Sequence, residues 1–222
     1  MSQRGATYKD TPSQPYRSAR IEQARKISDL GLYSVTYSNN VNHDVKSLEA
    51  YAVFREDARK AKFRHFLEVF NPAMDIGLKG ATLGEYVNDC IVRTLAGVMS
   101  VEYPLFLKMP YNGAAAMEEL ASYDPTKLIV GILGGGKGTT RDTFELATQA
   151  ERHGARVALF GRKINFAEAP VELVRLMRAS VEGQMKCADA VKAYHNYLQH
   201  NKIRADRSVA EDLEITDPVL KA

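Results

Sequence analysis

Apolar and polar positions follow two different periods along this chain, and the two periods alternate. Apolar residues three or four positions apart indicate helices, and they cover 45–62, 83–98, 114–122, 140–153, 170–181 and 184–199. Short runs rich in apolar or β-branched residues indicate strands, and they cover 32–38, 65–70, 104–109, 128–133 and 156–160. The pattern therefore predicts five strands, each followed by a helix.

Apolar strands joined by helical crossovers are typical of a parallel sheet covered on both faces, as in a doubly wound sheet or a barrel. A helix over 21–30 is expected to end at Gly31, because glycine readily takes the left-handed conformation that ends helices. We expect three parts: a polar lead-in over 1–19, an α/β body over 20–183, and a C-terminal helix with a loose tail over 184–222.

The composition is that of a globular protein, and it narrows the classes of partner that the protein is expected to bind. The 222 residues are 45% hydrophobic, with 30 Lys+Arg against 27 Asp+Glu, which excludes intrinsic disorder and low complexity. Neither a basic run of five residues nor an apolar run near the roughly 20 residues of a membrane span occurs. We therefore expect no nucleic-acid or membrane partner, and a cytoplasmic location. Cys90, Cys187 and five histidines without metal-ligand spacing predict no disulfide framework, no metal and no other cofactor.

Ligands of parallel α/β folds gather at the carboxyl ends of the strands, which draws attention to Lys108. This lysine lies inside an otherwise apolar strand, where burial would favour its neutral, nucleophilic form. The alternative is a lysine that extends to the rim of the strand without a chemical role.

Glu68 is the second candidate, in the segment His65-Phe66-Leu67-Glu68-Val69-Phe70. Residues two apart share a face of a strand, so Phe66 and Phe70 flank the carboxylate. A charged carboxylate among aromatic side chains needs a partner, and Lys108 is expected on the next strand. An acid beside an amine suits imine chemistry, while a purely structural ion pair is the alternative.

A glycine cluster, Gly134-Gly135-Gly136-Lys137-Gly138, separates a predicted strand from a predicted helix. Glycines allow backbone N–H groups to approach an anion, and a helix N-terminus favours negative charge. The next strand ends in Gly161-Arg162-Lys163, so the two loops together predict a phosphate site. A nucleotide-binding P-loop is disfavoured because Gly138 stands where Ser or Thr would hold Mg²⁺. A plain tight turn is the alternative.

These motifs, in this order and spacing, resemble those of one enzyme family over about residues 20–181. The family is the class I (Schiff-base) aldolases of the tagatose-bisphosphate and deoxyribose-phosphate aldolase superfamily, which are (β/α)₈ TIM barrels that cleave phosphorylated sugars without a metal. The resemblance rests on Ser28-Asp29-Leu30-Gly31, Phe66-Leu67-Glu68-Val69, Leu107-Lys108-Met109-Pro110, Leu133-Gly134-Gly135-Gly136 and Leu159-Phe160-Gly161-Arg162.

The resemblance implies a role for each matching residue. Lys108 matches the lysine that forms the Schiff base, and Glu68 matches a carboxylate that moves protons. The phosphate-binding loops are matched by Gly135, Gly136, Gly161 and Arg162. The implied activity is that of a lyase of carbohydrate metabolism acting on a phosphorylated sugar.

The resemblance begins at the family's fourth strand, so we expect a partial barrel of about five parallel strands without the first three βα units. Such a segment leaves two sheet edges unpaired, which predicts a homo-oligomer. The alternative function is that of a non-catalytic, truncated barrel that binds a phosphorylated metabolite or a partner chain.

Overall fold

The computed structural model describes residues 20–79 and 81–221, and the predicted lead-in over 1–19 lies outside them. The described residues form two compact units. The first unit runs to Gly77 and includes 89–107, whereas the second contains the remaining described residues. Each unit is described by itself below.

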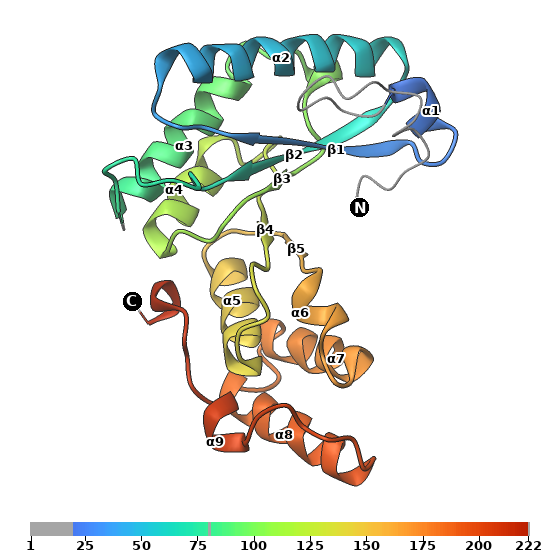
Figure 1. Cartoon of the computed structure of the whole chain (residues 1–222), viewed down its shortest axis with the longest axis vertical. Coiled ribbons are helices and arrows are strands. Elements are labelled where there is room, and N and C mark those ends of the chain that lie inside the picture. The colour runs from blue at the N-terminus through green and yellow to red at the C-terminus, as the bar shows by residue number, and fades with distance from the viewer. Residues whose placement is uncertain (1–19, 80, 222) are drawn as a thin grey trace. The chain divides into compact units, whose positions relative to one another are not determined.

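The first unit is a parallel sheet with helices (Figure 1). β1 and β2 pair in parallel, in a register that runs from Leu30 opposite Arg64 to Thr36 opposite Phe70. The sheet order is β1-β2-β3, and the chain that leads into β3 bonds to β2 through the Leu105 N–H and the His65 carbonyl at 2.9 Å. Its elements are α1 (Ile21–Arg25), β1 (Leu30–Thr36), α2 (Val41–Lys60), β2 (Arg64–Phe70), the second half of α3 (Ala81–Leu95), η1 (Ser100–Glu102) and the start of β3 (Leu107–Lys108).

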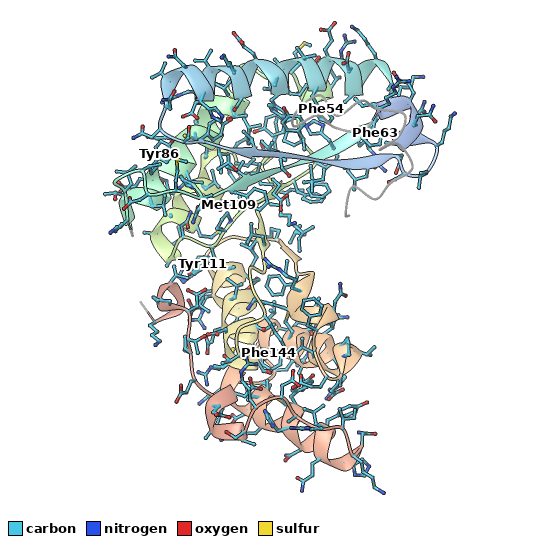
Figure 2. All side chains as sticks on the ribbon, viewed as in Figure 1. Phe54, Phe63, Tyr86, Met109, Tyr111 and Phe144 are labelled. Atoms are coloured by element: carbon cyan, nitrogen blue, oxygen red, sulfur yellow. The ribbon has the colours of Figure 1, made fainter. Side chains whose placement is uncertain are left out.

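Helix α2 covers one face of β1 and β2, and aromatic rings fill the space between them (Figure 1). Phe54 points from α2 toward the strands, and its ring centroid is 4.5 Å from that of Tyr33 (Figure 2). The buried Tyr51 hydroxyl and His65 Nε2 are hydrogen-bonded at 2.9 Å. Burial first, and the nearby Arg55 charge second, lower the pKa of His65 from 6.5 to about 4. His65 is therefore neutral in the folded protein at neutral pH.

The lowered pKa of His65 predicts a loss of stability in mild acid. Below pH 6.5 His65 of the unfolded chain is protonated, whereas His65 of the folded protein is protonated only near its lowered pKa of about 4. The free energy of unfolding therefore decreases as the pH is lowered across this interval, by about 2 kcal/mol between about pH 7.5 and about pH 5. Urea unfolding at the two pH values measures the slope. His65→Gln should reduce it, whereas His43→Gln, at an exposed position of α2, should retain it. An equal slope in all three proteins would contradict the prediction.

Gly31 was expected to end a helix, and this expectation is wrong. α1 ends at Arg25, and Gly31 lies inside β1 opposite His65. A Cβ at Gly31 would lie 2.4 Å from Cε1 of the buried Phe63 ring. Glycine is required here by this close approach and not by a left-handed turn.

The second unit contains a short parallel pair and most of the helices. β4 and β5 pair from Gly131 opposite Val157 to Leu133 opposite Leu159, and Met109, directly after β3, forms a parallel bridge to Ile132. The elements are α4 (Ala114–Tyr123), β4 (Gly131–Leu133), α5 (Thr140–Arg152), β5 (Val157–Leu159), α6 (Arg162–Asn165), α7 (Pro170–Val181), α8 (Cys187–His200), α9 (Val209–Asp212) and η2 (Pro218–Leu220).

The core of the second unit lies where α5, α7 and α8 pack on one another. Phe144 of α5 points into this core and is fully buried with Leu176 and Tyr194 (Figure 2). The Tyr194 hydroxyl accepts the Ala169 N–H at 2.9 Å and donates to Glu168 Oε2 at 3.2 Å. The C-terminal tail was predicted to be loose, and for the described residues this prediction is wrong. The tail forms α9 and η2 and makes hydrogen bonds to α5.

The predicted α/β class with parallel strands is confirmed. The described strands form one three-stranded and one two-stranded sheet, and among them no complete barrel is present. The last three strands, β3, β4 and β5, are shorter than predicted, above all in 104–109, of which only Leu107 and Lys108 form β3. Pro104 and Pro110 flank this segment without an N–H to donate, which limits regular pairing.

Candidate functional site

Glu68 lies in the middle of β2 and is 4% exposed. In the parallel register it stands opposite Ser34 of β1, whose Oγ donates to Glu68 Oε2 at 2.8 Å. Phe66, two residues earlier on the same strand face, stacks on Phe106 with ring centroids 4.7 Å apart. The carboxylate is thus held by a hydroxyl next to aromatic rings, as the sequence pattern indicates. Ser34 is an additional residue that the sequence analysis did not single out.

Lys108 is the second residue of β3 and is half-buried. Leu107 before it is fully buried, and Met109 after it is buried against β4, so the backbone at Lys108 is fixed on both sides. Glu68 belongs to the first unit and Lys108 begins a segment of the second. The pairing of this acid with this amine therefore stays a prediction.

The glycine-rich loop joins β4 to α5 and needs its glycines for two separate reasons. Gly135 and Gly138 have φ of +65° and +61°, a left-handed region that other residues seldom adopt. Gly134 is packed against Phe160, whose Cδ1 would lie 2.9 Å from an added Cβ. Gly135 and Gly136 are exposed, with open space where side chains would be. The loop therefore presents bare backbone to its surroundings.

In the second predicted loop Lys163 turns inward, whereas the expected site residue Arg162 faces solvent. Gly161 is the N-cap of α6, and Arg162 after it is exposed to solvent. Lys163 is instead 6% exposed, and its Nζ donates to the Lys137 carbonyl at 3.1 Å. Burial lowers the pKa of Lys163 although the charges of nearby carboxylates oppose the change. The sequence analysis named both cations and assigned only Arg162 to the site, because a one-turn helix does not reveal which of two adjacent cations turns inward.

The N-terminus of α5 is satisfied by the protein's own groups. Thr139 and Asp142 form a capping box, in which each side chain accepts the other residue's backbone N–H at 3.0 Å. The Thr140 N–H donates to the Asp212 carboxylate at 2.7 Å. The Lys137 ammonium, within the glycine-rich loop, is paired with the Asp206 carboxylate. Carboxylates thus occupy the N-terminus of α5, one of the groups expected to attract an anion.

The loop borders a small cavity in the second unit. Its volume is about 10 Å³, enough for a single water molecule and too small for a phosphate group. Its lining includes three cationic side chains, Lys137, Lys163 and Arg207, and the Glu168 side chain. The arrangement can hold an anion only if the surrounding side chains move.

The fold and these residues define the class of protein: an α/β protein with parallel strands, a buried carboxylate on β2 and a glycine-rich loop after β4. No family model and no curated protein matches the chain. Among the helices of residues 20–79 and 81–221, none is long and apolar enough to cross a membrane.

Proposed function

We propose that the protein is an aldolase-like lyase of the class I, Schiff-base type that cleaves or forms a carbon–carbon bond in a phosphorylated sugar. The observation that carries this proposal is the buried Glu68 carboxylate on β2, the strand next to β3 in the sheet order, where Ser34 of β1 donates a hydrogen bond to it. Burying a carboxylate in the middle of a strand costs free energy, which a proton-transfer role would explain. Lys108 on β3 supplies the amine.

In the proposed mechanism, the Lys108 amine attacks the ketose carbonyl, and uptake of one proton from solvent with loss of water leaves an iminium ion. Cleavage of the adjacent C–C bond releases an aldehyde, and the electron pair of the broken bond moves into the iminium to form an enamine. Glu68 accepts the hydroxyl proton released in this step and returns a proton to the enamine carbon. Hydrolysis then frees the second product and restores Lys108. Ser34 keeps the Glu68 carboxylate in place.

The arrangement of strands supports a partial (β/α)₈ barrel as the scaffold. In the first unit β1 pairs with β2 in parallel, and in the second unit β4 pairs with β5 in parallel while Met109 forms a parallel bridge to Ile132. Backbone N–H groups of Gly135, Gly136 and Gly161, with Arg162, would bind the sugar phosphate. Phosphate anchoring would hold the carbonyl near the amine. We include in this proposal a cytoplasmic location and a homo-oligomer.

Borohydride trapping tests the proposal directly. The protein is incubated with dihydroxyacetone phosphate and a panel of ketose mono- and bisphosphates, and sodium borohydride then reduces any iminium to a stable secondary amine. Peptide mapping by mass spectrometry should locate the adduct at Lys108. If no substrate in the panel gives an adduct at this residue, the proposed mechanism is wrong.

A second candidate function is a non-catalytic partial barrel that binds a partner chain. It is favoured by β1, a seven-residue strand that pairs only with β2 among the described residues. Leu32 on this strand is 39% exposed. Binding of a partner or self-association in light scattering, without a borohydride adduct, would favour this second function.

A further inference from the structure

An apolar groove lies within the second unit, between the β4-β5 pair and helices α5 and α7. Its volume is about 210 Å³, and eight of its eleven lining residues are apolar. Four of these eight are alanines, so small side chains leave the space open. The lining contains none of the residues assigned to the proposed aldolase reaction. The groove is therefore a separate feature of the fold.

The groove is open because of Ala158, the middle residue of β5. In the parallel register Ala158 stands opposite Ile132 of β4, so the two side chains share a face of the strand pair. Both line the groove, but Ile132 is 1% exposed whereas Ala158 is exposed. Parallel strands are normally covered by helices on both faces. Apolar strand surface is thus left uncovered at Ala158, where a larger side chain would fill the space.

Three charged side chains line the groove, and two of them are cationic. Arg178 is bonded through its Nε to Glu182 at 2.6 Å. Arg156 has weaker partners among the described residues: its Nη1 donates to the Ala155 carbonyl at 3.2 Å and lies 4.0 Å from Glu151 Oε1, beyond hydrogen-bond distance. A guanidinium carries five N–H donors, so Arg156 can donate to a further acceptor at the groove.

We infer that the groove binds a small amphiphilic carboxylate, with its hydrocarbon chain against Ala158 and Met177 and its carboxylate on Arg156. The apolar lining selects a hydrocarbon chain, and the two arginines against one glutamate select a negative charge over a positive one. A cavity of about 150 Å³ holds benzene and drug-sized ligands need about 300 Å³ or more, so this groove suits a chain of about six to eight carbons.

Octanoate is the probe for this site, and isothermal titration calorimetry on the full chain measures its affinity. Octylamine has the same chain with a positive charge, so it should bind at least about 10-fold more weakly than octanoate. Equal affinities for the two compounds would show binding to apolar surface alone and would overturn the inference.

The Arg156→Gln protein tests the charged contact. Octanoate should bind to it about 10-fold more weakly than to the unaltered protein, while the neutral octanol should bind to both equally. The matched control is Arg152→Gln, which removes the same charge from an exposed position at the end of α5 outside the groove lining. The control should keep the octanoate affinity of the unaltered protein.

The Ala158→Leu protein tests the apolar part of the site. Leucine fills the groove, so octanoate binding should be lost. Ala52→Leu makes the same change at an exposed position of α2, in the first unit, and should bind octanoate normally.

Methyl NMR of the unaltered protein decides the question even if the Ala158→Leu protein fails to fold. The Met177 methyl signal, assigned by its absence in a Met177→Leu protein, should shift when octanoate is added. The signal of Met74, which is 70% exposed in the first unit, should not shift.

The outcomes distinguish the possible occupants of the groove. A shift of Met177 with octanoate, together with preference over octylamine, supports the carboxylate site. An unchanged Met177 signal overturns it. If dilution of the protein alone shifts Met177, a second copy of the chain covers the groove, and the inference is overturned as well. The adduct at Lys108 is decided independently, because Lys108 is not part of the groove lining.

Discussion

Replacing Lys108 by methionine is expected to abolish the borohydride adduct and to slow ketose-phosphate cleavage by at least about 1,000-fold. Methionine has nearly the same length and suits a half-buried strand position, but it has no amine. Without the amine there is no iminium to accept the electron pair of the broken C–C bond. Adduct mass and the rate of aldehyde release measure the two effects.

Lys127→Met is the matched control for this experiment. Lys127 is exposed in the turn before β4, so its replacement should leave both the adduct and the rate unchanged. Lys163 is an alternative nucleophile, because it is a buried lysine whose pKa is lowered by burial. An adduct that persists in Lys108→Met and maps to Lys163 would show that the wrong lysine has been assigned.

Replacing Asp142 by asparagine is expected to lower the free energy of unfolding by about 4 kcal/mol. The Asp142 carboxylate is 2% exposed and accepts four hydrogen bonds, from the Thr139 N–H, the Thr216 N–H and hydroxyl, and the Asp217 N–H. An asparagine would direct an N–H₂ group at some of these donors. Urea unfolding followed by far-UV circular dichroism measures the loss.

The same carboxylate predicts a second, acidic transition. Burial by itself raises the pKa of Asp142, but hydrogen bonds from Thr216, Thr139 and Asp217 outweigh it, and the net shift is downward. Because the folded pKa lies below the ordinary value of 3.8, this stabilisation is complete above that pH. It is lost as the pH falls through the lower folded value.

Asp189→Asn is the control for both effects of Asp142→Asn. Its carboxylate is exposed on α8 and pairs loosely with Lys192 at 3.5 Å, so its removal should change stability by less than about 0.5 kcal/mol. Equal unfolding curves for the Asp142→Asn and Asp189→Asn proteins would show that the hydrogen bonds of Asp142 add little to stability.

Local patterns were sufficient to predict most of the regular structure. The helix expected over 170–181 is α7 with both bounds unchanged, because Pro170 favours a helix start and the apolar stripe after it is regular. Gly31 was assigned wrongly because its role depends on Phe63, a residue 32 positions away whose ring approaches β1. No local pattern reports such a contact.

The candidate site likewise has features that the sequence predicts and contacts that it does not. The alternation of Phe66, Glu68 and Phe70 predicts a carboxylate beside aromatic side chains, and its burial agrees with the structure. Its partner Ser34 could not be predicted, since the register of β1 against β2 places the two side by side and the sequence does not specify that register. The hydrogen bond between the Thr140 N–H and Asp212 could not be predicted either, because short polar stretches near a C-terminus resemble a solvated tail.

The distance along the chain between α5 and the C-terminal residues that bond to it has a consequence for biosynthesis. Asp212 lies 72 residues after Thr140, so the ribosome completes the glycine-rich loop and α5 well before the carboxylate that covers them has been made. During that interval the Thr140 N–H lacks this partner, so the first turn of α5 gains the hydrogen bond only after Asp212 has left the ribosome.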